Sequence, residues 1–311
     1  MSVYTSLARE QIESFIAPYA LGRLIHFQGI SAGIENTNYL LTTAQGRFVL
    51  TLYEHFNVSE VQCYLQLLRQ LAHRADYYPY PLVDAKEVYL QVLSDKPAAL
   101  FHCLPGASLQ SVSVQQIEAV ALALAHLHVS AASLSFSREN RRGLAWLKRA
   151  GKKIASALSA QEVALLDNEL AFQMAQNTTF LPQGIIHADL FKDNVLFVGN
   201  NLTGMLDFYA ACCDCFLLDI AIALNDWCVD EQGIFRQEWH EVFMRSYQQV
   251  RPLIKEELAC LPVFLRRASL RFWVSRWEHQ LYSQSGEVTQ EKDPDIFKRL
   301  LRQHQDAEAA A

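Results

Sequence analysis

The chain has 311 residues, of which 51% are hydrophobic and 19% are charged, and its formal net charge is −6. This composition allows a sizeable core in one large or two ordinary domains, and it excludes a largely disordered chain. The sequence contains no basic tract. A nucleic-acid partner is therefore not expected, because phosphate contacts need clustered Lys and Arg.

Neither a signal peptide nor an apolar stretch of membrane-spanning length is visible in the sequence. Its seven cysteines are an odd number in a long chain without export signals, which favours reduced thiols and a cytoplasmic location. The segment Cys212-Cys213-Asp214-Cys215 lacks the spacing of a zinc knuckle. We expect its cysteines to act as small buried hydrophobes, with no membrane partner for the chain.

Apolar periodicity in the first half predicts a small sheet with one packed helix. The expected elements are a helix over 6–19, strands over 24–30, 39–43 and 47–53, a helix over 57–74, and strands over 87–93 and 98–104. Asn57 and Glu60 form a capping box at the start of the second helix. These elements predict an antiparallel sheet of about five strands in an N-terminal lobe.

The small-residue turn before the second strand is a candidate cover for nucleotide phosphates, because its backbone N–H groups can bind them. An ordinary hairpin fits the same pattern equally well. Its candidate nucleotide contacts are Gly33, Ile34, Glu35, Asn36 and Asn38. The last strand of the lobe, with Phe101 and Cys103, offers a backbone edge with which an adenine could pair.

Pro105-Gly106 marks the expected domain boundary, with lobes over residues 1–104 and 105–311. Beyond this boundary the pattern is mainly helical, with helices expected over 114–130, 144–158, 161–176, 217–228, 236–249 and 256–283. His126 and His128 fall in the first of these helices, and we expect helix-end or core positions for them. The prediction is an α+β chain with a sheet-based N-terminal lobe and a larger, mainly helical C-terminal lobe.

The most informative stretch is Ile185 to Asp207, where polar side chains frame a hairpin. Asp189 lies in a loop after a short apolar run, and Asn194 follows it by five residues. Gly199-Asn200-Asn201 predicts a tight turn, so the second strand returns and places Asp207 near Asn194. Two hard oxygen ligands suit Mg²⁺, and Asp189 is placed to accept a proton from an attacking hydroxyl. Each residue alone is compatible with a turn or cap, but the combined pattern predicts a phosphotransfer site.

Several segments resemble the aminoglycoside-phosphotransferase-like kinases, a family with a bilobal protein-kinase-like fold. The motif His187-Ala-Asp189 with Asn194, followed by Leu206-Asp207-Phe208, carries the resemblance. The homoserine-kinase branch of that family is the most similar, through 33–40, 48–54, 187–197, 206–212, 219–228 and 270–276. The resemblance extends over nearly the whole chain.

This resemblance implies transfer of the ATP γ-phosphoryl group to the side-chain hydroxyl of L-homoserine, a step towards threonine. By position, Asp189 would be the base or hydroxyl-orienting residue, and Asn194 and Asp207 would hold Mg²⁺. His187 and Asp219 would have structural roles in the catalytic loop, although Asp219 also fits an ordinary helix N-cap. ATP and Mg²⁺ are therefore the expected cofactors.

The sequence departs from the wider kinase superfamily at two places. Thr51 stands where a phosphate-binding Lys is usual on the third strand, although the homoserine-kinase branch also has Thr there. Phe191 stands where protein kinases carry a Lys two residues after the Asp. Lys192 is adjacent and could reach the transferring phosphate, or it could be an exposed lysine without such a role.

A zwitterionic amino acid needs an acceptor for its ammonium group and a donor for its carboxylate, for which Arg is well suited. The candidates for these contacts are Asp214, Asn225, Asp226, Arg271 and Arg276, each of which also fits a surface or helix-end charge.

Other readings of the sequence are a kinase for choline, methylthioribose or an aminoglycoside, and a nucleotide-binding pseudokinase. The expected partner is a small-molecule substrate, and the chain is expected to be a monomer or homodimer.

Overall fold

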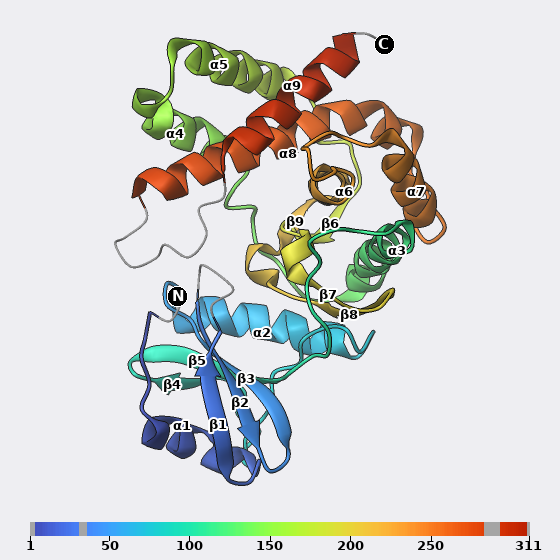
Figure 1. Ribbon diagram of the computed structural model, residues 1–311. Helices are drawn as coiled ribbons and strands as arrows, with labels where there is room; N and C mark the ends of the chain where they lie inside the picture. Colours follow the sequence, from blue (N-terminus) through green and yellow to red (C-terminus); the bar gives the residue numbers. More distant parts are fainter. Residues whose placement is uncertain (1–3, 31–35, 283–292, 310–311) are drawn as a thin grey trace. The chain divides into compact units, whose positions relative to one another are not determined.

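The computed structural model describes residues 4–30, 36–282 and 293–309 (Figure 1). These residues fall into two compact units that divide between Pro105 and Gly106. Unit 1 is built around a sheet, and unit 2 is mainly helical. In the described residues, no helix has both the length and the hydropathy needed to cross a bilayer.

Unit 1 contains an antiparallel five-stranded sheet with the order β1-β2-β3-β5-β4. Its strands are β1 (Leu24–Gly29), β2 (Thr37–Thr43), β3 (Gly46–Leu52), β4 (Gln91–Leu93) and β5 (Lys96–His102). β2 alternates between buried and half-buried residues, the pattern of a strand with one face on a core. β4 is shorter than predicted, because the Asp84 carboxylate accepts the N–H groups of Lys86 and Val88 and holds that segment in a turn.

Two helices and one short 3₁₀ turn complete unit 1: α1 (Arg9–Ile16), η1 (Ala17–Tyr19) and α2 (Val58–Ala72). Ile12, Phe15 and Ile16 of α1 belong to one core cluster with the inward residues of the sheet. The predicted capping box of α2 is present, since Asn57 accepts from the N–H of Glu60 and Glu60 accepts from the N–H of Asn57. α1 begins at Arg9, three residues later than predicted.

A buried carboxylate joins the start of the chain to the sheet of unit 1. Glu54 accepts hydrogen bonds from Thr5 and Thr37 and pairs with Lys96. Burial alone would raise the pKa of Glu54, but the hydrogen bonds from Lys96, Thr37 and Thr5 outweigh burial and lower it. The folded chain therefore binds this proton less readily than the unfolded chain does.

We expect Glu54→Gln to make the melting temperature depend less on pH in acidic solution. A carboxyl group with a lowered pKa in the folded state stabilises the fold above its ordinary pKa, and this contribution disappears as the pH falls through the folded-state pKa. Melting temperatures of wild type and variant, measured from about pH 7 to about pH 2, should converge only below the ordinary glutamate pKa of 4.5. Glu10→Gln, at an exposed position of α1, is the matched control. Parallel curves for wild type and Glu54→Gln would contradict the assignment.

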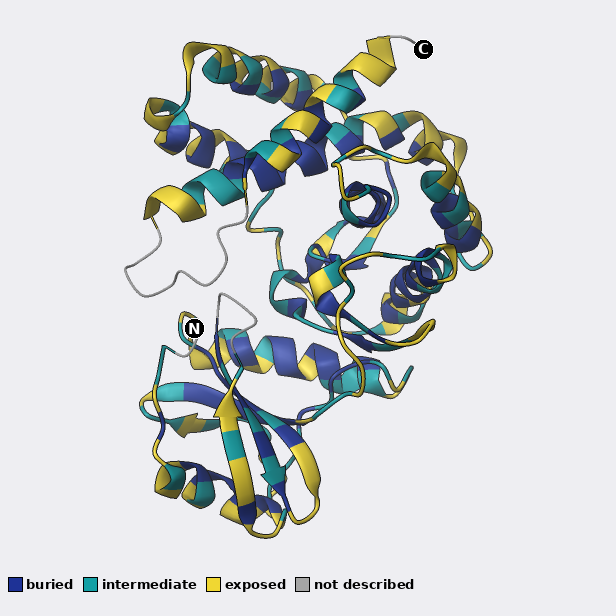
Figure 2. Cartoon of the chain, viewed as in Figure 1, coloured by how far each residue is buried: buried dark blue, intermediate teal, exposed yellow. Residues whose placement is uncertain are grey.

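Unit 2 contains most of the helices and two small sheets. The helices are α3 (Val114–Ser130), α4 (Leu144–Ile154), α5 (Ala160–Ala175), α6 (Phe216–Trp227), α7 (Gln237–Gln248), α8 (Lys255–Tyr282) and α9 (Asp295–Ala309), with 3₁₀ turns η2 (Ala131–Ser133), η3 (Ala155–Ala157), η4 (Lys192–Asn194) and η5 (Phe208–Ala210). The sheets pair β6 (Gln183–Ile186) with β9 (Cys212–Cys215), and β7 (Val195–Val198) with β8 (Asn201–Met205). Every residue of α6 except Asp226 is buried, and this helix is dark blue in Figure 2.

Two elements of unit 2 were not predicted. β9 forms from Cys212–Cys215, a segment without strand alternation, because it pairs with β6 almost thirty residues earlier in the chain. As expected, Cys212 and Cys215 are buried small residues, although Cys213 is exposed. α9 packs against α8, with Phe297, Leu300 and Leu301 buried.

The predicted hairpin of the central stretch is present as β7 and β8, with Val195 opposite Met205. Its turn has Gly199 at φ 61°, in the left-handed region that glycine tolerates. Ala107 pairs with Phe197 on the other edge of β7. Gly106, with φ 104°, has no room for a side chain, because a Cβ there would lie 2.5 Å from the Phe197 carbonyl oxygen.

Candidate active site

The loop that carries Asp189, called the catalytic loop after its predicted role, begins where β6 ends at Ile186, and a buried carboxylate fixes its course. The N–H groups of His187 and Ala188 donate to the two oxygens of Asp219, each at 2.7 Å. Ala188 has φ 65°, a conformation that is uncommon for a residue with a side chain. Asp219 thus holds the turn that presents Asp189, and its side chain does not cap α6, the helix in which it lies.

His187 joins the same loop to the end of β8. Its Nε2 donates to the Leu206 carbonyl at 2.7 Å, and its Nδ1 accepts from the N–H of Asp189 at 3.2 Å. Burial lowers the pKa of His187 despite the nearby charges of Asp219 and Asp189. A neutral imidazole with its proton on Nε2 satisfies both contacts, so His187 is a structural residue.

Asn194 fixes the position of Asp189 through its amide group. Its Nδ2 donates to the backbone carbonyl of Asp189 at 2.8 Å and to the Asp189 carboxylate at 3.2 Å. These bonds determine which end of the amide is nitrogen, and they leave Oδ1 as a hard oxygen donor. Asp189 is half-buried, so its carboxylate is accessible from one side.

Asp207 follows β8 and lies close to Asn194, as the hairpin predicted. The N–H of Leu206 donates to the Asn194 carbonyl at 2.8 Å, which extends the ladder of β7 and β8 to the residue before Asp207. Asp207 is in the left-handed conformation, with φ 58° and ψ 50°. This sharp change of direction ends the strand and turns the chain into η5.

Asn194 and Asp207 together fit Mg²⁺. This ion is commonly held by one or two carboxylate or amide oxygens, with substrate phosphates and waters completing its coordination. Asn194 is bonded to Asp189, and Asp207 follows Leu206, whose N–H donates to the Asn194 carbonyl, so this pair offers one amide oxygen and one carboxylate.

A buried chain of hydrogen bonds continues from Asp219 into the helices. His128 of α3 donates from Nε2 to Asp219 at 3.0 Å, and its Nδ1 accepts from the Tyr247 hydroxyl of α7 at 2.6 Å. Burial lowers the pKa of His128, although its bond to Asp219 opposes the shift. Burial would raise the pKa of Asp219, but the bond from His128 and the other donors lower it. The expectation of a core histidine at position 128 is therefore met, and His128 supports the catalytic loop indirectly.

His128→Leu should lower both stability and turnover. It leaves a buried carboxylate oxygen and the Tyr247 hydroxyl without this partner, which costs about 2–4 kcal/mol. We expect kcat to fall roughly tenfold or more through loss of loop positioning, with little change in the KM for nucleotide.

His128→Gln provides the test of positioning, because its amide nitrogen can still donate to Asp219. This variant should recover most of the kcat lost in His128→Leu. Unfolding curves and steady-state kinetics of both variants measure the two effects separately. Equal kcat values in the Leu and Gln variants would show that the bond to Asp219 has no role in turnover.

Three of the five predicted substrate residues have other roles. The Asn225 amide donates to Leu265 and Ser269 of α8 and accepts from His304 of α9, so it joins three helices and is withdrawn as a substrate contact. Asp226 accepts the N–H of Lys192 at 2.7 Å and so holds the catalytic loop. Arg276 donates to the Asp293 carbonyl and lies over the Phe297 ring.

One of the two expectations for Lys192, that of an exposed lysine, is not met. Its ammonium group donates to the Val229 carbonyl at 3.2 Å and is thereby tied to the end of α6.

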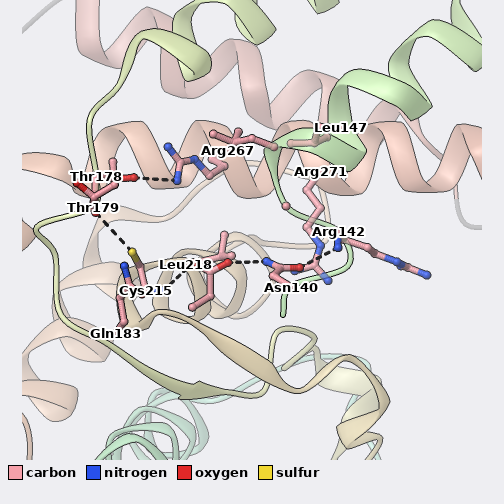
Figure 3. A pocket seen from close by; sticks show the side chains of 13 residues that line it. Asn140, Arg142, Leu147, Thr178, Thr179, Gln183, Cys215, Leu218, Arg267 and Arg271 are labelled. Atoms are coloured by element: carbon pink, nitrogen blue, oxygen red, sulfur yellow. Dashed lines mark hydrogen bonds between the residues drawn. The ribbon is translucent and has the colours of Figure 1, made fainter. Parts of the chain in front are cut away.

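The other two predicted substrate residues, Asp214 and Arg271, line a cavity of about 240 Å³ within unit 2 (Figure 3). Asp214 comes from β9, and Arg271 comes from α8. Asn140, Arg142 and Arg267 line the same cavity, and no sequence pattern singled them out. Residues 138–140 run beside β9, where the N–H of Cys213 donates to the Arg138 carbonyl, and this pairing brings Asn140 to Asp214.

The predicted nucleotide contacts are in unit 1. Gly33, Ile34 and Glu35 lie outside the described residues. Thr51 of β3 is buried, and its hydroxyl donates to the Asn38 side chain of β2 at 2.7 Å. Asn36 is also buried, and its Oδ1 accepts from the N–H of Glu54. These contacts join the start of β2 to the end of β3, two interior strands of the sheet.

The prediction that the last strand of the lobe offers a backbone edge to an adenine needs one correction. The N–H of Cys103 donates to the Arg47 carbonyl at 3.1 Å, because the pairing of β3 with β5 continues one residue beyond the strand. This amide is therefore not free to pair with a base. Phe101 is buried in β5, where it faces Val49 on one side and bridges to Pro81 on the other.

Comparison with solved structures shows the fold. The chain resembles amicoumacin kinase hAmiN, solved with AMP-PNP and Ca²⁺, with a TM-score of 0.73 and 16% identity over 97% of this chain and 94% of that chain. It resembles a microcompartment-associated aminopropanol kinase with a TM-score of 0.75 and 18% identity, over 97% of each chain. The predicted α+β, protein-kinase-like fold is confirmed.

Residues 26–253 match the model of the phosphotransferase enzyme family, so the chain belongs to this family. Among curated relatives, the homoserine kinase of Methylobacillus flagellatus is 42% identical over 302 residues, which cover 97% of this chain and 95% of the relative. The homoserine kinase of Neisseria meningitidis serogroup B is 39% identical over 301 residues, covering 97% of this chain and 99% of the relative. The resemblance found in the sequence motifs is thereby confirmed.

Proposed function

We propose that this protein transfers the γ-phosphoryl group of ATP to the side-chain hydroxyl of L-homoserine and produces O-phospho-L-homoserine and ADP. The observation that carries the proposal is the convergence of Asp189, Asn194 and Asp207 in one loop and hairpin, in a chain similar to curated homoserine kinases along nearly its full length. The function is that of a small-molecule kinase with an alcohol acceptor.

In this mechanism Asp189 accepts a hydrogen bond from the substrate hydroxyl and takes its proton as the new P–O bond forms. Phosphoryl transfer passes through a loose transition state, so orientation of the hydroxyl contributes more than its activation. The bonds from Asn194 to the backbone and carboxylate of Asp189 restrict the position of this base. Asp219 and His187 keep the loop in the required conformation.

Mg²⁺, bound with the nucleotide, would neutralise charge on the transferring phosphates. The residues proposed to hold it are Asn194, through Oδ1, and Asp207, through its carboxylate. We retain unit 1, with Asn36, Asn38, Thr51 and Phe101, as the proposed nucleotide-binding lobe. Because Thr51 is neutral, it adds no positive charge to the α- and β-phosphates, and the metal must supply more of that charge.

The first experiment is a Mg²⁺-dependent ADP-release assay on the purified protein, with Asp189→Ala as the blank. The panel contains L-homoserine, L-serine, L-threonine, choline, methylthioribose and an aminoglycoside. Turnover confined to L-homoserine, with a phosphomonoester product identified by ³¹P NMR, supports the proposal. Turnover of another alcohol in its place would keep the reaction class and overturn the substrate.

An alternative is a kinase for another small alcohol, which the fold alone also permits, since the structural relatives include an aminopropanol kinase and amicoumacin kinase. The near full-length similarity to several homoserine kinases favours the first proposal. A pseudokinase is disfavoured, because all three polar residues proposed for phosphoryl transfer are present. Asn194 is bonded to Asp189, and Leu206, the residue before Asp207, donates to the Asn194 carbonyl.

A further inference from the structure

The cavity of unit 2 has positively charged donors on its α8 side. Arg267 and Arg271 are one helical turn apart on α8 and both line the cavity. Only 2% of Arg271 is exposed, and its Nε and Nη1 are buried without a hydrogen-bond acceptor among the described residues. Burying a guanidinium group in this way is costly unless an anion is bound to it.

The two arginines that α8 contributes to the cavity differ in the hydrogen bonds they already make. Arg267 donates from Nε to Gln173 at 2.9 Å and from Nη1 to Thr178 at 3.5 Å, so it is anchored to the wall of the cavity (Figure 3). Arg271 points along the cavity towards Arg142 and Asn140 in the same view. Among the described residues, one buried nitrogen of Arg267 (Nη2) and two of Arg271 (Nε and Nη1) have no acceptor, so Arg271 has more donors left for a ligand.

A second guanidinium group lies near Arg271. Burial, and after it the positive charge of Arg142, lower the pKa of Arg271 to about 10, whereas the charge of Asp189 acts in the opposite direction. Arg142 donates from Nη1 to Ser275 at 3.0 Å, which fixes its head group beside α8. Two cations held near each other in a buried place form a site for an anion. The influence of Asp189 shows that this site is within electrostatic range of the reacting centre.

The opposite wall carries a negative group. Asp214 accepts from Asn140 Nδ2 at 2.7 Å and from the N–H of Cys215 at 2.7 Å, so its carboxylate is held in one orientation. Carboxylate oxygens accept more than one hydrogen bond each, so Asp214 retains capacity for a cationic ligand. The cavity thus presents both signs of charge, which matches a zwitterion.

We infer that this cavity recognises the amino-acid head group of the substrate, with the α-carboxylate on Arg271 and Arg142 and the ammonium group on Asp214. This inference rests on the proposed function and specifies which part of the substrate each residue binds. Arg271 is a specificity-determining residue, because a substrate without the carboxylate leaves its buried donors unpaired. Arg276, the other arginine predicted for this role, does not line this cavity.

The test compares L-homoserine with two analogues that each lack one charged group. 3-Aminopropan-1-ol lacks the carboxylate, and 4-hydroxybutanoate lacks the ammonium group. Arg271→Met should lower kcat/KM for L-homoserine and 4-hydroxybutanoate by about 10²–10³-fold and change that for 3-aminopropan-1-ol by less than ~3-fold. Asp214→Asn should lower kcat/KM for the two substrates that carry an ammonium group and leave kcat/KM for 4-hydroxybutanoate unchanged.

Two further variants control for effects on folding. Arg266→Met removes another arginine of α8, one whose guanidinium is already paired with Glu169 and Glu308. The kcat/KM values of the three substrates relative to one another should therefore not change. Arg271→Lys keeps the charge but loses the bidentate fork, and it should lower kcat/KM for the carboxylate substrates by roughly tenfold. It replaces Arg271→Met if circular dichroism shows that the Met variant is unfolded.

Calorimetric titration of L-homoserine without ATP separates this inference from the proposed function. Binding by wild type that is lost in Arg271→Met or Arg271→Lys supports the head-group site even if no phosphoryl transfer occurs. If the wild-type protein does not turn over L-homoserine, the proposed function is overturned, but the inference about the head-group site is not. Equal losses for L-homoserine and 3-aminopropan-1-ol, or L-homoserine binding that is independent of Arg271, overturn the inference.

Discussion

Asp207→Ala is expected to reduce kcat/KM by roughly 10³–10⁵-fold, since a metal ion at the transferring phosphate supplies several kcal/mol of charge stabilisation. With Asp207 removed, Asn194 is the sole protein ligand left of the proposed pair. Asp207 also adopts the left-handed conformation, which alanine tolerates poorly, so part of the loss in this variant will come from the backbone.

Asp207→Asn separates the charge from the backbone. Asparagine accepts the left-handed conformation readily and keeps one oxygen ligand, while the negative charge is lost. We expect a higher Mg²⁺ requirement in this variant, measured as the metal concentration that gives half-maximal ADP release at fixed ATP. Asp193→Asn removes the same charge from an exposed neighbour of Asn194 and should leave that concentration unchanged. The metal assignment fails if Asp207→Asn has the Mg²⁺ dependence of wild type.

Asp189→Ala is expected to lower kcat by about 10²–10⁴-fold, the range for loss of a positioned general base. The variant should still bind nucleotide with Mg²⁺, because the proposed metal ligands are intact. Asn194 loses one hydrogen-bond acceptor but keeps its bond to the backbone carbonyl of residue 189. The loop should therefore keep its conformation.

Single-turnover kinetics and nucleotide titrations check this prediction together. A fall in the phosphoryl-transfer rate with an unchanged Kd for ATP and Mg²⁺ is the expected result. Asp189→Asn keeps the size of the side chain and should be as slow as Asp189→Ala, because neither side chain accepts the proton. A nucleotide Kd that rises in parallel with the loss of rate would move Asp189 from the chemical step to the binding of ATP.

Local sequence patterns determined much of the hairpin site. Glycine and asparagine at 199–201 specify a tight turn, and the apolar strands on either side of it set a register in which residue 194 and residue 207 come together. The helix cap at Asn57 was equally local, since it needs only Glu60 three residues later. Such features are predictable because the interacting groups are close in the chain.

Contacts between distant segments were not predictable in this way. Cys212–Cys215 becomes a strand because Gln183–Ile186 is available beside it, although its own residues show no strand pattern. Asn225 and Asp226 were both predicted as substrate contacts, but packing places one between α6, α8 and α9 and the other under the catalytic loop. The sequence around a polar residue does not indicate whether its side chain will join helices, hold a loop or contact a substrate.

The sequence by itself indicated the class of chemistry, because the proposed catalytic base and the proposed metal ligands lie on one continuous segment, 189–207, whose turns are set by neighbouring residues. Only the tertiary structure decided which of the two predicted arginines lines the cavity. Arg271 and Arg276 are similar in sequence context, but Arg276 is bonded to the Asp293 carbonyl, whereas Arg271 is buried at a cavity with Arg142 and Asp214. That distinction depends on burial and on Arg142 and Asp214, which lie more than fifty residues before Arg271 in the chain. Residue type and spacing do not encode such contacts.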